Sequence, residues 1–204
     1  VGDLAFDLDS SVRARARRAP KNSYKSNKTY LAELQGAKAR IERISVDDLD
    51  VLMLRNDPAE DRIKRPWATT AGIMFGRAAL RRGVIVLNDP DGLAKAMTKM
   101  YFQLFPEEVR PKTLITRDRE EIQLFRKQHG DVVMKPLYGH GGAAVFRVQP
   151  QDQNFGSLYD IFASTWREPW VIQKFLPEVA KGDKRIILVD GVYAGAVNRV
   201  PAAD

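Results

Sequence analysis

The 204-residue sequence contains no cysteine, which excludes disulfide bonds, thiolate metal sites and thiol nucleophiles. No apolar run approaches the roughly 20 residues that cross a bilayer, and no secretory signal opens the chain. The two histidines, His129 and His140, show no ligand spacing. No Ser-His-Asp arrangement and no cluster of metal ligands is visible. These absences fit a cytoplasmic protein without a membrane partner.

The sequence does contain charge of both signs, with an excess of cations. Charged residues make up 29% and hydrophobic residues 44%, a balance typical of soluble globular proteins. The 33 Lys and Arg exceed the 26 Asp and Glu, which gives a net charge of +7. Nucleic-acid binding is one interpretation, but the one dense basic cluster, residues 13–18, carries no aromatic residue for base stacking. We therefore predict an enzyme of anionic substrates without a nucleic-acid partner, and a solvated strand or turn edge at this cluster.

The first half of the chain has the pattern of a βαβ unit. Residues 50–54 and 84–87 are short apolar runs that predict buried strands, and residues 67–82 have apolar residues at helical spacing. Two such strands joined by a helix indicate a parallel sheet. Ligands of parallel sheets lie at the carboxyl ends of the strands, where Arg55 and Asp57 fall.

The second half predicts shorter elements and hairpins. Asp118 is a good N-cap for a helix over Arg119–His129, and Glu121 would complete a capping box. We place the domain boundary near residues 90–99. The other predicted elements are helices over 92–105 and 155–166, strands over 112–116 and 170–175, and a hairpin over 185–199 that turns at Asp190-Gly191.

The segment 131–148 is the most informative one. Residues 132–134 predict a buried strand that ends in Lys135, and glycines over 139–142 open a loop before a second strand at 143–148. An ammonium group that emerges from an apolar strand needs an anionic partner, because burying it unpaired is costly. Glycines allow several backbone N–H groups to point at one ligand, which suits phosphate oxygens. The segment therefore favours a nucleotide triphosphate site over the alternative of a hairpin turn without a ligand.

Two further segments are candidates for contacts with a nucleotide. Residues 173–176 end a strand before Pro177, where free backbone groups and an apolar side chain could meet an adenine ring. Asp183 and Arg185 share one side of a predicted strand and could hold a ribose hydroxyl and a phosphate. The alternative is a surface ion pair that contributes little stability. Arg199, on the returning strand, could join Arg185 in facing an anion.

Taken together, these segments resemble the ATP-grasp superfamily, and within it the bacterial glutathione synthetases. The combination of Lys-Pro-Leu-x-Gly-x-Gly-Gly with a downstream Gly-Asp-Lys-Arg is the most specific part of the match. The similarity is collinear over essentially the whole chain and runs through DVLMLRNDP (50–58), VLNDP (86–90), PKTLITR (111–117), VMKPLYGHGGAAVFRV (133–148), IQKFLP (172–177) and GDKRIILVDG (182–191).

The resemblance implies an α/β fold that becomes α+β in its second half. It predicts a parallel α/β substrate-binding domain over 1–98 and an ATP-grasp domain over 99–204, with a small lobe at about 110–175 and the start of a large lobe at 176–204. Relative to the family the chain starts late and stops before the second glycine-rich substrate loop and the acidic Glu-x-Asn segment that binds magnesium. We therefore expect a piece truncated at both ends that is inactive alone, and name no metal ligand.

The resemblance also implies roles for individual residues. Arg185 and Arg199 are the expected catalytic residues, because they would face the transferred phosphate or the peptide carboxylate. The expected ATP contacts are Lys99, Lys135, Gly139, His140, Gly141, Gly142, Gln173, Lys174, Phe175, Leu176 and Asp183.

The implied activity is ATP-dependent ligation of γ-glutamylcysteine with glycine through an acyl phosphate, with Mg²⁺ or Mn²⁺ as the metal. A homo-oligomer, a tetramer in the family, is expected. Two alternatives stay open. One is another ATP-grasp carboxylate-amine ligase, of the ribosomal-protein glutamate ligase or D-alanine ligase type, and the other is a non-catalytic basic nucleotide-binding module.

Overall fold

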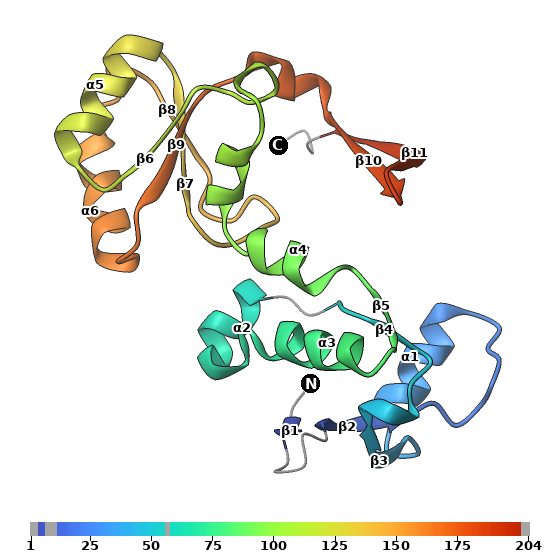
Figure 1. The fold of residues 1–204 in the computed structure, drawn as a ribbon. Coiled ribbons are helices and arrows are strands. Elements are labelled where there is room, and N and C mark those ends of the chain that lie inside the picture. The colour runs from blue at the N-terminus through green and yellow to red at the C-terminus, as the bar shows by residue number, and fades with distance from the viewer. Residues whose placement is uncertain (1–3, 7–11, 56–57, 201–204) are drawn as a thin grey trace. The chain divides into compact units, whose positions relative to one another are not determined.

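The computed structural model describes residues 4–6, 12–55 and 58–200, so the predicted ligand position Asp57 lies outside the described residues. The chain divides into two compact units (Figure 1). The first comprises Val1–Tyr101 with Tyr138–His140, and the second comprises Phe102–Leu137 with Gly141–Asp204. Among the helices of the described ranges, none combines the length and the apolar character that a bilayer span requires.

The first unit contains a three-stranded antiparallel sheet in the order β1-β2-β3. Its strands are β1 (Leu4–Phe6), β2 (Val12–Arg18) and β3 (Arg40–Ser45), and α1 (Asn27–Gln35) lies between β2 and β3 in the sequence. The basic cluster at 13–18 is therefore a strand, as predicted, but the middle strand rather than an edge. Arg17 donates to the carbonyl oxygen of Gln35 at 2.9 Å, which satisfies a free acceptor at the end of α1.

The predicted βαβ unit is confirmed. β4 (Val51–Met53) pairs in parallel with β5 (Ile85–Leu87), and the connection holds α2 (Pro58–Lys64), η2 (Pro66–Ala68) and α3 (Ala71–Arg81). Leu52 and Val86 pack against a core that contains Phe75 and Ala79. The prediction of wholly buried strands is wrong, because alternation turns the other side chains of β4 and β5 away from this core, and they are exposed.

The single helix predicted over 92–105 is wrong. The structure has α4 (Pro90–Lys95), which ends at Ala96, followed by the separate 3-10 segment η3 (Lys99–Leu104). The hydroxyl of Thr98 accepts from the backbone N–H of Met100 at 3.2 Å. Because a threonine hydroxyl competes with helical carbonyls for backbone N–H groups, this contact favours a break at residues 96–98.

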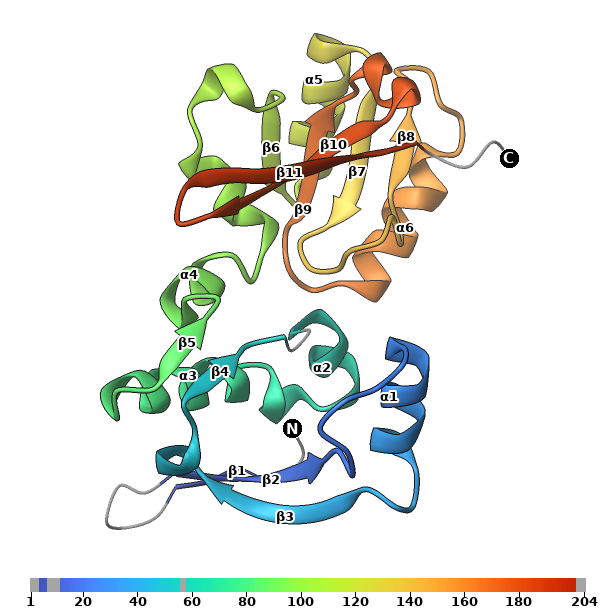
Figure 2. The same cartoon turned by 90° about the vertical axis from the view of Figure 1, so that its right-hand side faces the viewer.

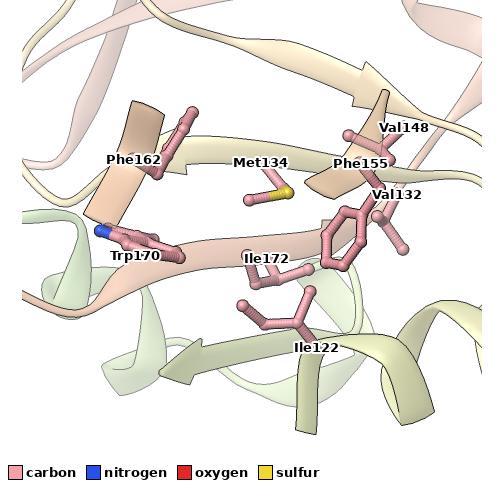
Figure 3. Packing of buried hydrophobic residues seen from close by; sticks show 8 residues of the cluster. All are labelled: Ile122, Val132, Met134, Val148, Phe155, Phe162, Trp170 and Ile172. Atoms are coloured by element: carbon pink, nitrogen blue, oxygen red, sulfur yellow. The ribbon is translucent and has the colours of Figure 1, made fainter. Parts of the chain in front are cut away.

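The second unit is built on a four-stranded antiparallel sheet in the order β6-β9-β7-β8. Its strands are β6 (Thr113–Thr116), β7 (Val132–Pro136), β8 (Phe146–Val148) and β9 (Trp170–Lys174). α5 (Arg119–His129) and α6 (Phe155–Thr165) cover one face (Figures 1 and 2). The core between sheet and helices consists of Ile122, Val132, Met134, Val148, Phe155, Phe162, Trp170 and Ile172 (Figure 3).

The bounds predicted for α5 are confirmed, and its N-cap is Asp118. The Asp118 carboxylate accepts from the backbone N–H groups of Glu120 and Glu121, both at 2.9 Å. The capping box is incomplete, because the hydroxyl of Thr116 takes the backbone N–H of Asp118 at 3.0 Å and donates to the Glu121 carboxylate. The helix therefore begins at a cap shared by three side chains.

The hairpin predicted at the end of the chain is also confirmed. β10 (Asp183–Val189) pairs antiparallel with β11 (Val192–Arg199), and Asp190 and Gly191 both have positive φ at the turn. This geometry is that of a tight two-residue hairpin turn. The remaining short helices are η1 (Val46–Asp48), η4 (Glu107–Val109) and η5 (Pro177–Lys181). The strand predicted over 143–148 is shorter, because residues 141–144 form a turn.

Candidate active site

The sheet of the second unit has one helix-covered face and one face that carries the candidate site. Strand alternation turns Met134 and Ile172 into the core. The same alternation places Lys135 of β7 and Gln173 of β9 on the opposite face, on neighbouring strands. Cross-strand pairing sets Val133 beside Gln173, and Lys135 beside Val171. Two residues that the sequence analysis assigned to ATP thus share one face of the sheet.

Lys135 is a half-buried cation without a counter-charge. Burial lowers the pKa of its ammonium group, and no carboxylate contributes an opposing effect. Among the described residues none forms a hydrogen bond or ion pair with its Nζ. A folded protein keeps such a group at a cost to its stability, so an anionic ligand is the expected partner.

The glycine loop after β7 has a backbone that only glycine adopts readily. Gly139, Gly141 and Gly142 have φ values of 104°, 67° and 80°, and a Cβ at any of them would meet nothing within 4 Å. The glycines are therefore required by backbone conformation rather than by crowding. In the first unit, Lys99 Nζ donates to the carbonyl oxygen of Gly139 at 2.9 Å, so the structure brings these two predicted ATP contacts together.

The two histidines lie in different parts of the second half of the chain. His140 lies in the glycine loop and is exposed. His129, the last residue of α5, is half-buried, and the centroid of its ring lies 4.3 Å from that of Phe125. The stretch of described residues contains no group of three or more His, Cys, Asp or Glu that could hold a metal ion.

The connector at 173–176, which comprises the end of β9 and the two residues after it, is held by hydrogen bonds to neighbouring segments. Lys174 N–H donates to the carbonyl oxygen of Lys112 at 2.9 Å, and Phe175 N–H donates to that of Asp131, also at 2.9 Å. The guanidinium of Arg147 lies over the Phe175 ring, with Cζ 4.1 Å from its centroid. Leu176 is exposed. The connector therefore presents an apolar side chain from a fixed backbone.

An open cavity of about 340 Å³ lies on the second unit, next to Gln173. Its volume is in the range of small-ligand pockets. The Gln173 side chain is only 7% exposed, and its Nε2 donates to Thr113 Oγ1 at 2.8 Å. The cavity is lined by Phe102, Phe105, Val109, Arg110, Pro111 and Gln173.

In the terminal hairpin, Asp183 pairs with Arg199, whereas the sequence hypothesis placed Asp183 beside Arg185. Asp183 and Arg199 face each other across the two strands and form an ion pair, with about half of each side chain exposed. Arg185 follows two residues after Asp183 and is exposed. Arg199 is thus already paired with a carboxylate, and its predicted role toward an anion requires that this exposed pair open.

Sequence reasoning missed three groups of residues around the site. Thr113 holds Gln173, Arg147 covers Phe175, and the segment 102–111 lines the cavity. The pairing of Thr113 with Gln173 spans 60 residues of sequence, so no local pattern reveals it. Of the segment 102–111, residues 102–105 had been assigned to the end of the helix predicted over 92–105, and the rest had been given no element.

Comparison with solved structures defines the fold. The fold matches that of the D-cycloserine synthetase DcsG, with a TM-score of 0.54 at 14% identity over 77% of this chain and 54% of that chain. It also matches the ATP-grasp ligase PsnB in its complex with precursor peptide PsnA2 and AMPPNP, with a TM-score of 0.51 at 20% identity over 74% and 52%. The fold is that of the ATP-grasp enzymes.

Sequence comparison assigns the family within that class. The sequence profile described as "Prokaryotic glutathione synthetase, ATP-grasp domain" matches residues 98–204. The glutathione synthetase of Rhodopseudomonas palustris is 55% identical over 79% of this chain and 50% of the relative. That of Agrobacterium fabrum is 38% identical over 99% and 66%. The chain belongs to the prokaryotic glutathione synthetase family, and it spans about half the length of the first of these relatives.

Proposed function

We propose that the protein carries out the ATP-dependent ligation of γ-glutamylcysteine with glycine. Support comes from the family assignment and from Lys135, a half-buried cation without a counter-charge on the face of an ATP-grasp sheet that lies opposite the helices. That cation is the observation that carries the proposal. A fold-level likeness alone would not separate a ligase from a binding module.

In the proposed reaction, a carboxylate oxygen of γ-glutamylcysteine attacks the γ-phosphorus of ATP. The bond to the β,γ-bridging oxygen breaks, and ADP leaves. The amine of glycine then attacks the carbonyl carbon of the acyl phosphate, loses a proton and displaces inorganic phosphate. Catalysis of this kind depends mainly on positioning and on neutralising phosphate charge.

The chain's own residues would serve the nucleotide part of this reaction. We assign Lys135, Lys99 and the backbone N–H groups of residues 139–142 to contacts with the phosphates. The connector at 173–176 would meet the adenine ring and Asp183 the ribose. Arg185 and Arg199 would stabilise the transferred phosphate or the peptide carboxylate.

We also propose Mg²⁺ or Mn²⁺ as the accompanying ion, by analogy with PsnB, whose solved complex contains Mg and ADP. A divalent ion would neutralise phosphate charge. The described residues contain no cluster of ligands for this ion. We therefore propose that phosphate oxygens of the nucleotide would bind it. A cytoplasmic homo-oligomer is the proposed form of the enzyme.

The test is a product assay on the complete polypeptide that carries this sequence. Supplied with ATP, γ-glutamylcysteine and glycine, it should release ADP and form glutathione, detected by mass spectrometry. Replacing glycine by D-alanine or glutamate should abolish the product. Equal use of these amines would overturn the substrate assignment while leaving the fold class intact. Lack of ADP release with every acceptor would overturn the ligase itself.

A further inference from the structure

A hydrogen-bond relay fixes the orientation of the Gln173 side-chain amide. The hydroxyl of Thr113 donates to the carbonyl oxygen of Pro111 at 2.8 Å. A hydroxyl group has one hydrogen, so Thr113 Oγ1 can act toward Gln173 only as an acceptor. The group of Gln173 that faces Thr113, at 2.8 Å, is therefore the amide nitrogen and not the amide oxygen. The relay removes the usual ambiguity between the two ends of a glutamine amide.

This orientation leaves the amide oxygen for another partner. Gln173 is almost fully buried and lines the cavity of about 340 Å³. Its Oε1 accepts no hydrogen bond from any of the described residues. This oxygen is not among the fully enclosed, unpartnered polar atoms of the described side chains, so it remains accessible, and a ligand in the cavity that offers an N–H group can donate to it.

The other side chains of the cavity wall do not compete with this oxygen for a ligand's N–H group. Phe102, Phe105, Val109 and Pro111 present apolar surface. Arg110 is the other polar residue of the lining, but its Nε donates to the carbonyl oxygen of Phe105 at 3.0 Å and its NH1 donates to Gln103. The guanidinium is thus committed to its own segment, and among the lining side chains Gln173 is the one that offers a ligand an acceptor oxygen.

We propose that Thr113 is a positioning residue for nucleobase selection: it holds Gln173 with its amide oxygen toward the cavity, where that oxygen accepts a hydrogen bond from the 6-amino group of adenine. The inference rests on the proposed function, since it takes ATP as the substrate. In a purine with a 6-oxo group, the 6-oxygen would face the Gln173 amide oxygen, and two acceptors cannot form a hydrogen bond with each other. Sites built around a buried hydrogen bond discriminate strongly against analogues that cannot form it.

The test compares ATP with ITP, which differ at the purine 6-position, in the complete polypeptide with saturating γ-glutamylcysteine and glycine. The wild type should have the higher kcat/KM with ATP. Thr113→Val keeps the shape but removes the relay, so the amide is free to turn, and the ATP/ITP ratio of kcat/KM should fall about tenfold. Thr113→Ser keeps the hydroxyl and should retain the wild-type ratio.

A second variant separates amide orientation from general damage to the fold. In Thr113→Val/Gln173→Glu the carboxylate presents an acceptor at either oxygen, so the ATP preference should return despite the missing hydroxyl. Should Thr113→Val fail to fold, Gln173→Leu takes its place and is expected to lose the preference. Melting curves by circular dichroism identify folded variants.

The outcomes distinguish this inference from the proposed function. An unchanged ATP/ITP ratio in folded Thr113→Val, or a double variant that stays unselective, would overturn the role of Thr113 while glutathione synthesis stands. A wild type that forms no glutathione from ATP would overturn the proposed function instead. In that case equilibrium binding of ATP and ITP to the same variants decides the nucleobase question.

Discussion

The guanidinium of Arg147 is held between the ring of Phe175 and the carboxylate of Asp131. Its Cζ lies 4.1 Å from the ring centroid, and its Nε donates to Asp131 Oδ2 at 2.9 Å. The carbonyl oxygen of Asp131 in turn accepts from the Phe175 N–H at 2.9 Å. Three residues from β8, from the start of β7 and from the end of β9 thus fix the connector proposed to meet the adenine ring.

Removing the contacts of Arg147 with Phe175 and Asp131, here called the clamp, should raise the KM for ATP without changing kcat. In Arg147→Ala the Phe175 ring loses its cation and the connector becomes more mobile, so the KM for ATP should rise about fivefold, as expected for one cation–π contact. The kcat should stay within about twofold, because Arg147 touches no reacting group. Steady-state kinetics measures both constants. Arg81→Ala, which removes an equal charge from α3, should change neither, and an equal KM in both variants would contradict the clamp.

Lys135 should lower the stability of the nucleotide-free protein, although it contributes to ATP binding. Replacing it by Met keeps the chain length and removes an unpaired, half-buried charge, so the free energy of unfolding should rise by about 1 kcal/mol. Urea unfolding without nucleotide measures this. Lys127→Met, on the exposed side of α5, is the matched control and should leave stability unchanged. A Lys135→Met variant less stable than the wild type would show that the lysine is a structural residue.

The pH dependence of ATP affinity should report on the same ammonium group. Burial lowers the pKa of Lys135, so in the nucleotide-free protein this group loses its proton at a lower pH than an exposed lysine does. Between the folded and the unfolded pKa the folded chain binds fewer protons, so stability rises with pH in that window. ATP affinity should fall as pH rises through the lowered pKa.

Lys135→Arg provides the comparison for this pH profile. A guanidinium remains charged throughout the accessible range, so the alkaline loss of affinity should disappear in the variant. Calorimetric titration with ATP across neutral and alkaline pH gives the two profiles. Identical profiles would assign the titration to another group.

Gly182 should control the entry into the terminal hairpin. Its φ is +99°, and a Cβ there would lie 2.7 Å from the carbonyl oxygen of Arg199. Gly182→Ala should therefore disturb the pairing of Asp183 with Arg199 at a local cost of about 1 to 3 kcal/mol. Hydrogen exchange of the β11 amides should accelerate. Gly195→Ala, where a Cβ meets nothing within 4 Å, should leave exchange unchanged, and equal protection in both variants would refute the argument.

Local patterns in the sequence predicted helix ends and turns well, because these depend on residues that are close together in the sequence. The bounds of α5 followed from Asp118 as N-cap and Gly130 after its end, and the hairpin turn followed from Asp190-Gly191. The break between α4 and η3 escaped prediction because the spacing of apolar residues does not reveal the contact between the Thr98 hydroxyl and the Met100 N–H.

The sequence predicted which residues belong to the candidate site, but it did not predict the contacts between them. The strand pattern placed Lys135 at the end of β7, but its lack of a counter-charge depends on every neighbour in the fold. The orientation of the Gln173 amide requires Thr113, which pairs with it only because β6 lies beside β9 in the sheet. Sheet order is a tertiary property, and the local patterns of a single sequence do not reveal it.

The central claim is that Lys135 remains unpaired in order to hold a nucleotide phosphate. Isothermal titration of ATP into the complete polypeptide tests it most directly, with Lys135→Met and Lys127→Met measured beside the wild type. The account predicts equal dissociation constants for the wild type and Lys127→Met, and binding at least about tenfold weaker for Lys135→Met, since a charge-assisted contact to phosphate is lost. A Lys135→Met protein that binds ATP as tightly as the wild type would contradict it.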